Sequence, residues 1–175
     1  MTRLTHTERW TAYTDEVTDP AGRPGTYEWV DTPDLVRVAT VTPDDEVHLV
    51  YQYEYLPRRG MWQLPGGAVA AGEDPATAAA RALAIQAGVI AGRWRSYGAV
   101  WPMPGLTPAR VHLFSAEDLA DDPEGTPRDP ATQPVPVPMP MEQAVTAALD
   151  NSIGCAASAQ LVLALAATRR SDPAT

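Results

Sequence analysis

Apolar and β-branched residues cluster along the chain in short runs separated by turn-forming residues, and this pattern predicts a series of strands. The stretch 19–25, DPAGRPG, is an example of such a turn. The run 47–55 is long and rich in tyrosine, so we expect it to be buried on both faces. The polar ends, residues 1–8 and 170–175, are expected to be loose. The predicted strands cover residues 26–30, 35–42, 47–55, 61–64, 93–101 and 110–115.

Helices are expected in the middle of the chain and near its C-terminus. The clearest one begins after the N-cap Asp74, has Pro75 at its first position, and ends at Gly88, which suits a left-handed C-cap. The apolar segments 141–149 and 156–168 predict a pair of C-terminal helices. Strands, a central helix, further strands and terminal helices together predict an α+β sandwich.

Composition narrows the class of protein. A length of 175 residues with 45% hydrophobic content fits a single domain, residues 1–175, with one core. The formal net charge of -9 argues against a nucleic-acid polymer as a partner, because such partners need a basic surface. A single cysteine, Cys155, excludes an intrachain disulfide and a multi-cysteine zinc site. Without a signal-peptide pattern or a membrane-spanning apolar run, we expect a cytoplasmic protein that contacts no membrane.

The segment 121–140 differs in composition from the rest of the chain. It is rich in proline and acidic residues, and its last prolines alternate with valine and methionine. This pattern predicts an extended connector leading to the C-terminal helices, residues 141–168. The alternative is a proline-rich ligand for another protein.

The most informative pattern lies in residues 64–89, LPGGAVAAGEDPATAAARALAIQAGV. It resembles the Nudix box, in which a glycine is followed after five residues by glutamate. Seven further residues then lead to Arg-Glu-hydrophobic-any-Glu-Glu-any-Gly-hydrophobic. The resemblance implies the Nudix fold, with mixed β-sheets sandwiched between helices and an N-terminal region of antiparallel strands. The matching positions are Gly67, Glu73, Arg81, Leu83, Gly88 and Val89.

The three positions that are acidic in that box are occupied here by Ala82, Ile85 and Gln86. Carboxylates placed about one turn apart on a helix converge on one hard cation, and magnesium binds almost entirely to oxygen. Alanine and isoleucine supply no oxygen, and glutamine supplies a neutral carbonyl. The resemblance implies that Glu73 mainly supports the loop. We therefore expect no metal and no other cofactor, and a loss of ordinary hydrolysis on the order of a thousandfold or more.

The flanking segments resemble the ADP-ribose pyrophosphatases, a resemblance that spans about residues 26–168. The run LVYQYEYLPRRGMWQLPGG is similar to a strand ending in Arg-Gln-Tyr-Arg, followed by a Glu-Leu-Pro-Ala-Gly turn. Both arginines are absent, Glu54 replaces one of them, and Gln63 replaces the glutamate of the turn. Pro104 lies fifteen residues past the box, which in that family marks ADP-ribose substrates, whereas Ala109 stands where an assisting acid is usual.

The N-terminal strands, residues 1–42, have a second implication. In the ADP-ribose pyrophosphatases such strands reach across to a second subunit. The weaker resemblance of residues 10–42 to that region implies a homodimer here.

Polar and aromatic residues are expected to line the former substrate cleft and to contact a small-molecule ligand. The catalytic candidates are Glu54, His112 and Glu73. The alternatives are that the aromatic residues serve core or dimer packing, that Arg110 and His112 lie on a solvated strand face, and that Glu54 pairs with Arg58 or Arg59. The ligand-binding candidates are Tyr51, Tyr53, Trp62, Gln63, Gly66, Gly67, Gln86, Trp101 and Arg110.

Three functions remain open from the residues. The first is metal-independent chemistry on a small organic molecule, which an acid or histidine of raised pKa would favour. The second is a non-catalytic protein that binds or senses a nucleotide or a sugar. The third is a slow pyrophosphatase for ADP-ribose or nucleoside-diphosphate sugars with an unusual metal site.

Overall fold

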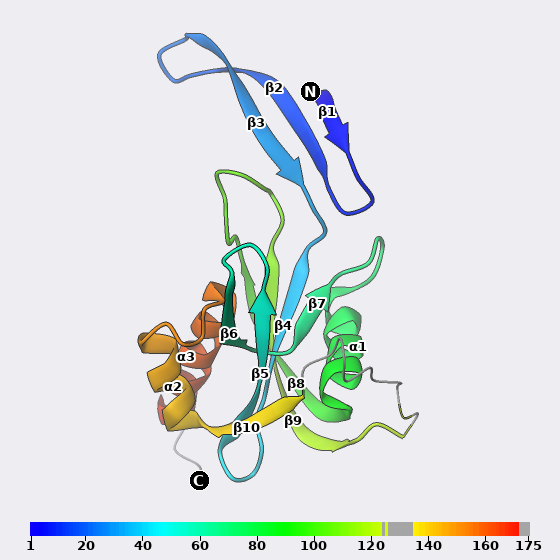
Figure 1. The fold of residues 1–175 in the computed structure, drawn as a ribbon, viewed down its shortest axis with the longest axis vertical. Coiled ribbons are helices and arrows are strands. Elements are labelled where there is room, and N and C mark those ends of the chain that lie inside the picture. Colours follow the sequence, from blue (N-terminus) through cyan, green and yellow to red (C-terminus); the bar gives the residue numbers. More distant parts are fainter. Residues whose placement is uncertain (124, 126–134, 172–175) are drawn as a thin grey trace.

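The computed structural model describes residues 1–123, 125 and 135–171. Within these residues the strands form three sheets (Figure 1). The N-terminal sheet contains β1 (Thr2–His6), β2 (Thr11–Thr18) and β3 (Pro24–Asp31). The mixed sheet contains β7 (Gly66–Ala68), β4 (Leu35–Thr40), β9 (Val111–Asp121) and β8 (Val89–Val100), in that order. The third sheet contains β10 (Pro136–Pro140), β5 (Glu46–Glu54) and β6 (Arg59–Gln63), in that order.

Helices cover the sheets on both sides. They are α1 (Pro75–Ala87), α2 (Met141–Leu149) and α3 (Ala156–Ser171). Helix α1 lies on one side, and α2 and α3 lie on the other (Figure 1). This arrangement confirms the predicted α+β sandwich.

Strand β4 divides the core into two parts, because alternate residues of a strand point to opposite faces. Val36 and Val38 pack with Leu83 of α1 in one cluster. Ala39, on the other face, belongs to a larger cluster with Leu161 of α3. Arg37 lies between the two valines and therefore points to the α3 side, where the rest of the face is apolar.

Helix α1 has the predicted ends. Asp74 accepts hydrogen bonds from the backbone N–H groups of Ala76 (2.9 Å) and Thr77 (3.2 Å). Gly88 has a φ of 70° and donates its N–H to the carbonyl of Ala84. Both ends satisfy backbone groups that a helix otherwise leaves unpaired, so the boundaries predicted from local residues are confirmed.

Two segments expected to be irregular are strands. Residues 1–8 were expected to be loose, but β1 pairs antiparallel with β2. The Gly66-Gly67 turn is in fact β7, which pairs antiparallel with residues 35–37 of β4. In both cases the pairing comes from a neighbouring strand and not from the segment's own propensity, and such tertiary pairing overrides local pattern.

The end of the predicted extended connector, residues 121–140, is a strand paired in a sheet. Residues 124 and 126–134 of that connector lie outside the described residues. Residues 136–140 form β10, the edge strand beside β5. Only every second residue of an edge strand turns its N–H toward its neighbour, so Val137 and Met139 can donate to β5 while the alternating prolines face outward.

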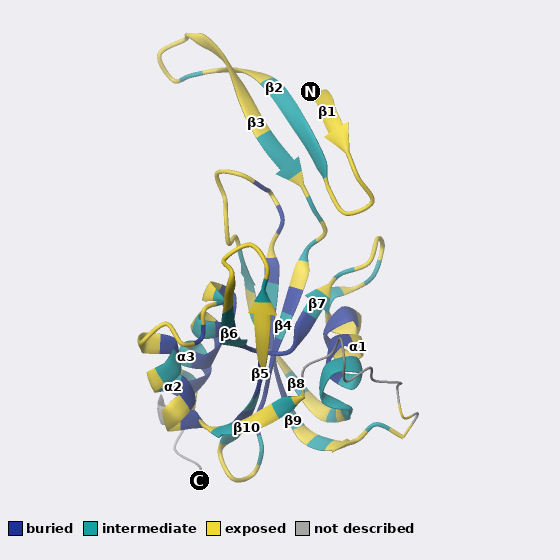
Figure 2. Ribbon diagram, viewed as in Figure 1, coloured by how far each residue is buried: buried dark blue, intermediate teal, exposed yellow. Residues whose placement is uncertain are grey.

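The prediction that residues 47–55 are buried on both faces is wrong for the second half of the run. Val47, Leu49 and Val50 are buried, but Tyr51 and Tyr53 are 55% and 63% exposed. The reason is that the β5–β6 hairpin extends beyond the layers that cover its base (Figure 2). Its exposed end has local packing of its own, since the rings of Tyr51 and Trp62 meet edge to face with centroids 5.2 Å apart.

The N-terminal sheet projects away from the rest of the domain, and most of its surface is exposed (Figure 2). Two hydrogen bonds connect it to the loop between β8 and β9: Val30 N to Leu106 O at 2.9 Å, and Tyr27 Oη to Gly105 O at 2.7 Å. None of the helices in the described part of the chain is long and apolar enough to cross a membrane.

Candidate functional site

The segment from β7 to α1 contains the motif found in the sequence. Gln86 holds in place the start of β7 at Gly66, which we call the Gly66 turn. The N–H of Gly66 donates to Gln86 Oε1 at 3.0 Å. Gln86 Nε2 donates in return to the carbonyl of Gly66. The side-chain amide of Gln86 thus contacts both the backbone N–H and the backbone carbonyl of Gly66. Gln86 Oε1, the oxygen that could face a cation, already accepts a hydrogen bond.

Glu73 braces the loop between β7 and α1. Its carboxylate accepts hydrogen bonds from Arg81 Nε (2.9 Å), from Arg81 Nη2 (2.8 Å) and from the N–H of Ala70 (2.8 Å). Arg81 also donates to the carbonyl of Ala68 at 2.8 Å. The hydrogen bonds from Arg81, with that from Ala70, lower the pKa of Glu73 from 4.5 to about 2. Both carboxylate oxygens are therefore committed to the loop.

The residues present do not fit a magnesium centre at this motif. Ala82 is buried in the cluster under α1, and Ile85 is half-buried and apolar. Glu73 and Gln86 are engaged as described above. In the part of the chain that the structure describes, no group of three or more His, Cys, Asp or Glu side chains is arranged to hold a metal ion. Magnesium needs several oxygen donors free to face it, and they are missing here.

A polar network lies beside the turn, centred on Gln63, which is only 5% exposed. Gln63 Oε1 accepts from Arg37 Nη2 at 3.1 Å. Gln63 Nε2 donates to Glu54 Oε1 at 2.9 Å and to Gln52 Oε1 at 3.2 Å. Among the ion pairs of the described residues, none joins Glu54 to Arg58 or Arg59. The network places a cation and a carboxylate at opposite ends of one buried amide.

Cys155 adjoins this network just before α3. Burial by itself raises the pKa of the Cys155 thiol, but the charge of Arg37 and hydrogen bonds from Ser158 bring it below its usual value. Ser158 is fully buried, and its Oγ accepts the N–H of Leu64 at 3.1 Å. Helix α3 thereby fixes the backbone that leads into the turn.

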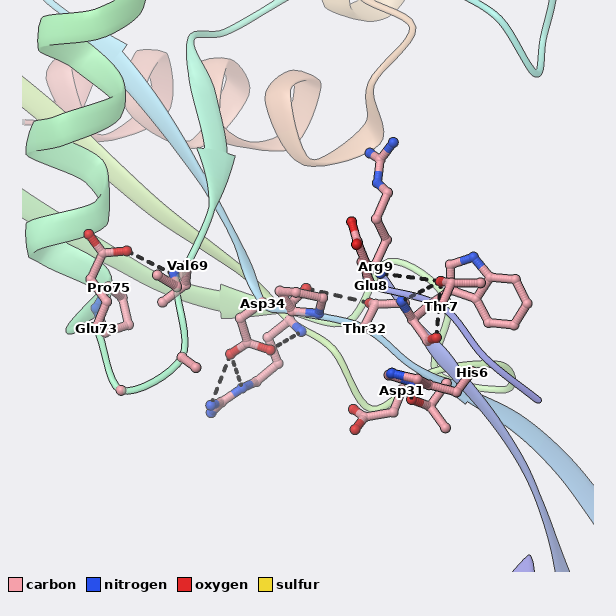
Figure 3. Close-up of a pocket in the computed structure, with 17 residues that line it drawn as sticks. His6, Thr7, Glu8, Arg9, Asp31, Thr32, Asp34, Val69, Glu73 and Pro75 are labelled. Atoms are coloured by element: carbon pink, nitrogen blue, oxygen red, sulfur yellow. Dashed lines mark hydrogen bonds and ion pairs between the residues drawn. The ribbon is translucent and has the colours of Figure 1, made fainter. Parts of the chain in front are cut away.

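An open pocket of about 550 Å³ lies beside the loop between β7 and α1 (Figure 3). Three segments form it: the β1–β2 turn, the β3–β4 linker and the loop that precedes α1. Its volume is within the usual range for small-molecule sites. It is lined by residues 6–11, 31–34, 69–73, 75 and 110.

Asp34 forms a wall of the pocket and joins the β3–β4 linker to β9. It accepts hydrogen bonds from the backbone N–H of Arg110 (2.8 Å) and from Arg110 Nε (3.3 Å), and its Oδ2 lies 2.8 Å from His112 Nε2. Partial burial alone would raise the pKa of Asp34. The hydrogen bonds from Arg110 and His112, together with their charges, instead lower the pKa below its ordinary value of 3.8.

The residues predicted to line one cleft are divided among three places. Glu54, Gln63, Gly66, Gly67 and Gln86 lie at the turn and its network. Arg110 and Glu73 line the pocket, and His112 stands behind Asp34. A third group lies apart from both: Tyr51 and Tyr53 are exposed on the β5–β6 hairpin, and Trp101 is exposed after β8. Trp62, also on that hairpin, is half-buried and packs against the larger core cluster.

Sequence reasoning missed Arg37 and Asp34. Arg37 had a signal, because it is the single charged residue in the otherwise apolar and β-branched strand LVRVAT. Asp34 had none, since its partners Arg110 and His112 are more than seventy residues away and only the parallel pairing of β4 with β9 brings them together.

Replacing Glu73 by Gln should weaken the loop in a pH-dependent way. Because the pKa is lowered on folding, the carboxylate stabilises the fold fully above its ordinary value of 4.5 and loses this effect as the pH falls through about 2. We expect Glu73→Gln to lower the melting temperature at pH 7. Between pH 4.5 and 2, the melting temperature of this variant should fall less steeply than that of the wild type. Circular dichroism melts measure both, with Glu16→Gln on β2 as control. If the melting temperatures of Glu73→Gln and the wild type fell in parallel as the pH decreased, the stabilising role of the Glu73 carboxylate would be contradicted.

Comparison with known proteins identifies the class to which this fold and motif belong. The Nudix domain matches residues 31–153, and the chain belongs to the Nudix family. Within that family it is similar to the ADP-ribose pyrophosphatases of Bacillus subtilis (strain 168) and Mycobacterium tuberculosis (strain ATCC 25618 / H37Rv). It is 31% identical to each over 108 residues, which are 62% and 61% of this chain. The resemblance predicted from the box and its flanks is thereby confirmed.

The matched regions make up 58% and 52% of those two relatives, so the chain spans a little over half of their length. A solved structure described as an ADP compounds hydrolase superposes with a TM-score of 0.83 and covers 98% of this chain and 92% of its own. Its sequence identity is 16%, and the likeness therefore shows the shared fold alone.

Proposed function

We propose that this Nudix-family protein has lost magnesium-dependent pyrophosphate hydrolysis and that it binds a small organic molecule without a metal. One observation supports the loss above all. At the turn where the family pattern places its magnesium-binding glutamates, the remaining polar groups already bind the protein itself: Gln86 binds Gly66, and Glu73 binds Arg81 and Ala70. A cation entering there would have to break these contacts before it gained any ligand.

The binding role is supported by the pocket beside the loop. Its volume of about 550 Å³ suits a small molecule. The acids with lowered pKa in its wall, Asp34 and Glu73, remain ionised at neutral pH, so neither is a proton donor there. This favours binding over acid catalysis by these two residues.

Metal-independent chemistry is the second candidate, and one contact favours it. Asp34 Oδ2 lies 2.8 Å from His112 Nε2, the geometry in which a carboxylate orients an imidazole that accepts or donates a proton. In this case His112 would exchange the proton and Asp34 would hold its ring. Turnover without metal that is lost in His112→Asn but retained in Glu54→Gln would identify this candidate.

The experiment that tests the loss measures hydrolysis of ADP-ribose and a panel of nucleoside-diphosphate sugars. Excess magnesium or manganese is present, and products are separated by chromatography. An active ADP-ribose pyrophosphatase assayed alongside is the positive control. We expect the rate of this protein to be lower by about a thousandfold or more, since a catalytic metal lowers such barriers by several kcal/mol. Metal-dependent turnover that disappears in Glu73→Gln would instead establish a slow pyrophosphatase with an unusual metal site.

We also infer a homodimer in which the N-terminal sheet contacts a second copy. The sheet projects from the domain, and apolar side chains on it, Leu4, Val17 and Tyr27, are exposed. A small sheet with exposed apolar groups gains stability by packing against another surface. Size-exclusion chromatography with light scattering should give about twice the 18.8 kDa of one chain. A mass of one chain would contradict the inference.

A further inference from the structure

Arg37 occupies the space beside the Gly66 turn. The two residues are paired across β4 and β7, so their side-chain directions share one face of the sheet. A Cβ atom placed on Gly66 would lie 2.5 Å from Arg37 Nη1 and 3.0 Å from Arg37 Cδ. The arginine side chain therefore crosses directly over Gly66. The backbone of the same glycine is held by Gln86, so Arg37 and Gln86 meet at one residue of the turn.

No carboxylate of the described residues forms an ion pair with Arg37. Its Nη2 donates to Gln63, which is neutral, its guanidinium also interacts with the thiol of Cys155, and its Nε is buried without a hydrogen-bond partner. Glu54 is reached only through the amide of Gln63. A half-buried guanidinium in this situation projects a strong positive potential, because a protein interior screens charge much less than water does.

That potential lies at the turn to which the Nudix box would otherwise bring magnesium. A divalent cation there would meet a fixed positive charge in a poorly screened site, and the repulsion weakens metal binding even when carboxylates are available. The missing glutamates and Arg37 are therefore two separate obstacles to a metal. The first removes the ligands, and the second opposes the ion.

We infer that Arg37 determines the ion specificity of this turn: it excludes divalent cations and supplies in their place the positive charge of the site. The inference rests on the proposed loss of magnesium-dependent hydrolysis and names the residue that maintains it. It implies that returning the glutamates to α1 is not sufficient to restore a metal site.

The test restores carboxylates at two half-buried positions, Ile85→Glu and Gln86→Glu, and leaves the buried Ala82 unchanged. Manganese binding to this double variant is measured by electron paramagnetic resonance titration, with and without Arg37→Met. Methionine keeps an unbranched apolar stem and removes the charge. We expect Arg37→Met to tighten the Kd for manganese by about tenfold or more, because the like charge is gone.

Arg23→Met on the β2–β3 turn is the matched control, since it removes one arginine far from the box. It should change the Kd by less than about twofold, as a distant exposed charge is screened by salt. Thermal melts verify that each variant is folded. If the double variant does not melt cooperatively, the same comparison is made with Gln86→Glu alone.

A manganese Kd that is the same with Arg37 as with methionine would overturn the inference, and so would an equal effect of Arg23→Met. These outcomes are separate from a failure of the proposed function. Metal-dependent hydrolysis by the unaltered protein would disprove the loss of activity. An unchanged Kd would show only that Arg37 is not what excludes the metal.

Discussion

Replacing Gly66 by alanine is expected to lower the free energy of unfolding by about 3 kcal/mol, because a methyl group does not fit there. The new Cβ would collide with the carbonyl oxygen of Val36 and would lie 2.5 Å from Arg37 Nη1. The first of these atoms belongs to the central strand β4 and cannot move without disturbing the sheet. Urea denaturation followed by circular dichroism measures the loss.

The next residue offers a control with the same chemical change. A Cβ on Gly67 would have as its nearest neighbour Ala82 Cβ at 3.8 Å, an ordinary van der Waals distance. Gly67→Ala should therefore change stability by no more than about 1 kcal/mol in either direction. Similar losses for both variants would show that the close approach of Arg37 and Val36 to Gly66 is not as described.

Truncation of Leu64 should cost about as much, by another mechanism. The side chain is 0% exposed and belongs to the larger core cluster with Leu49 and Leu161. Leu64→Ala leaves a cavity beneath the Gly66 turn, and we expect a loss of about 3 kcal/mol in the free energy of unfolding. Equilibrium denaturation provides the value.

Leu56 is the matched control for that substitution. It lies in the loop between β5 and β6 and is 88% exposed. Leu56→Ala should alter stability by less than about 0.5 kcal/mol. Equal effects of the two leucine substitutions would mean that the turn is not supported by the core under it.

The fold was predictable where local residues decide the structure. Asp74, Pro75 and Gly88 define α1 through contacts within the helix and its ends. Strand β7 could not be foreseen, because its three residues pair with β4 and have no pattern of their own. The same limit applies to β1, whose polar sequence is ordered by pairing with β2. Segments that depend on a partner distant in sequence escape prediction from local pattern.

The candidate site was likewise predictable only where residues close together in the sequence determine its geometry. The spacing of the box residues placed Gln86 at the turn beside Gly67 and placed Glu73 in the loop that follows, because a strand, a loop and a helix in succession determine that geometry. The pocket could not be predicted, since residues 6–11, 31–34 and 69–73 come together only in the folded chain. The contact between Asp34 and His112 likewise depends on the register of β4 and β9.

The prolines of β10 have a consequence for how copies of this protein behave at high concentration. An exposed sheet edge normally offers N–H groups to which another chain can add a strand, and such edges seed aggregation. On β10 the outward positions are Pro136, Pro138 and Pro140, which have no N–H to offer. The strand thus completes the β5 ladder on its inner side and cannot serve as a template for a further strand on its outer side.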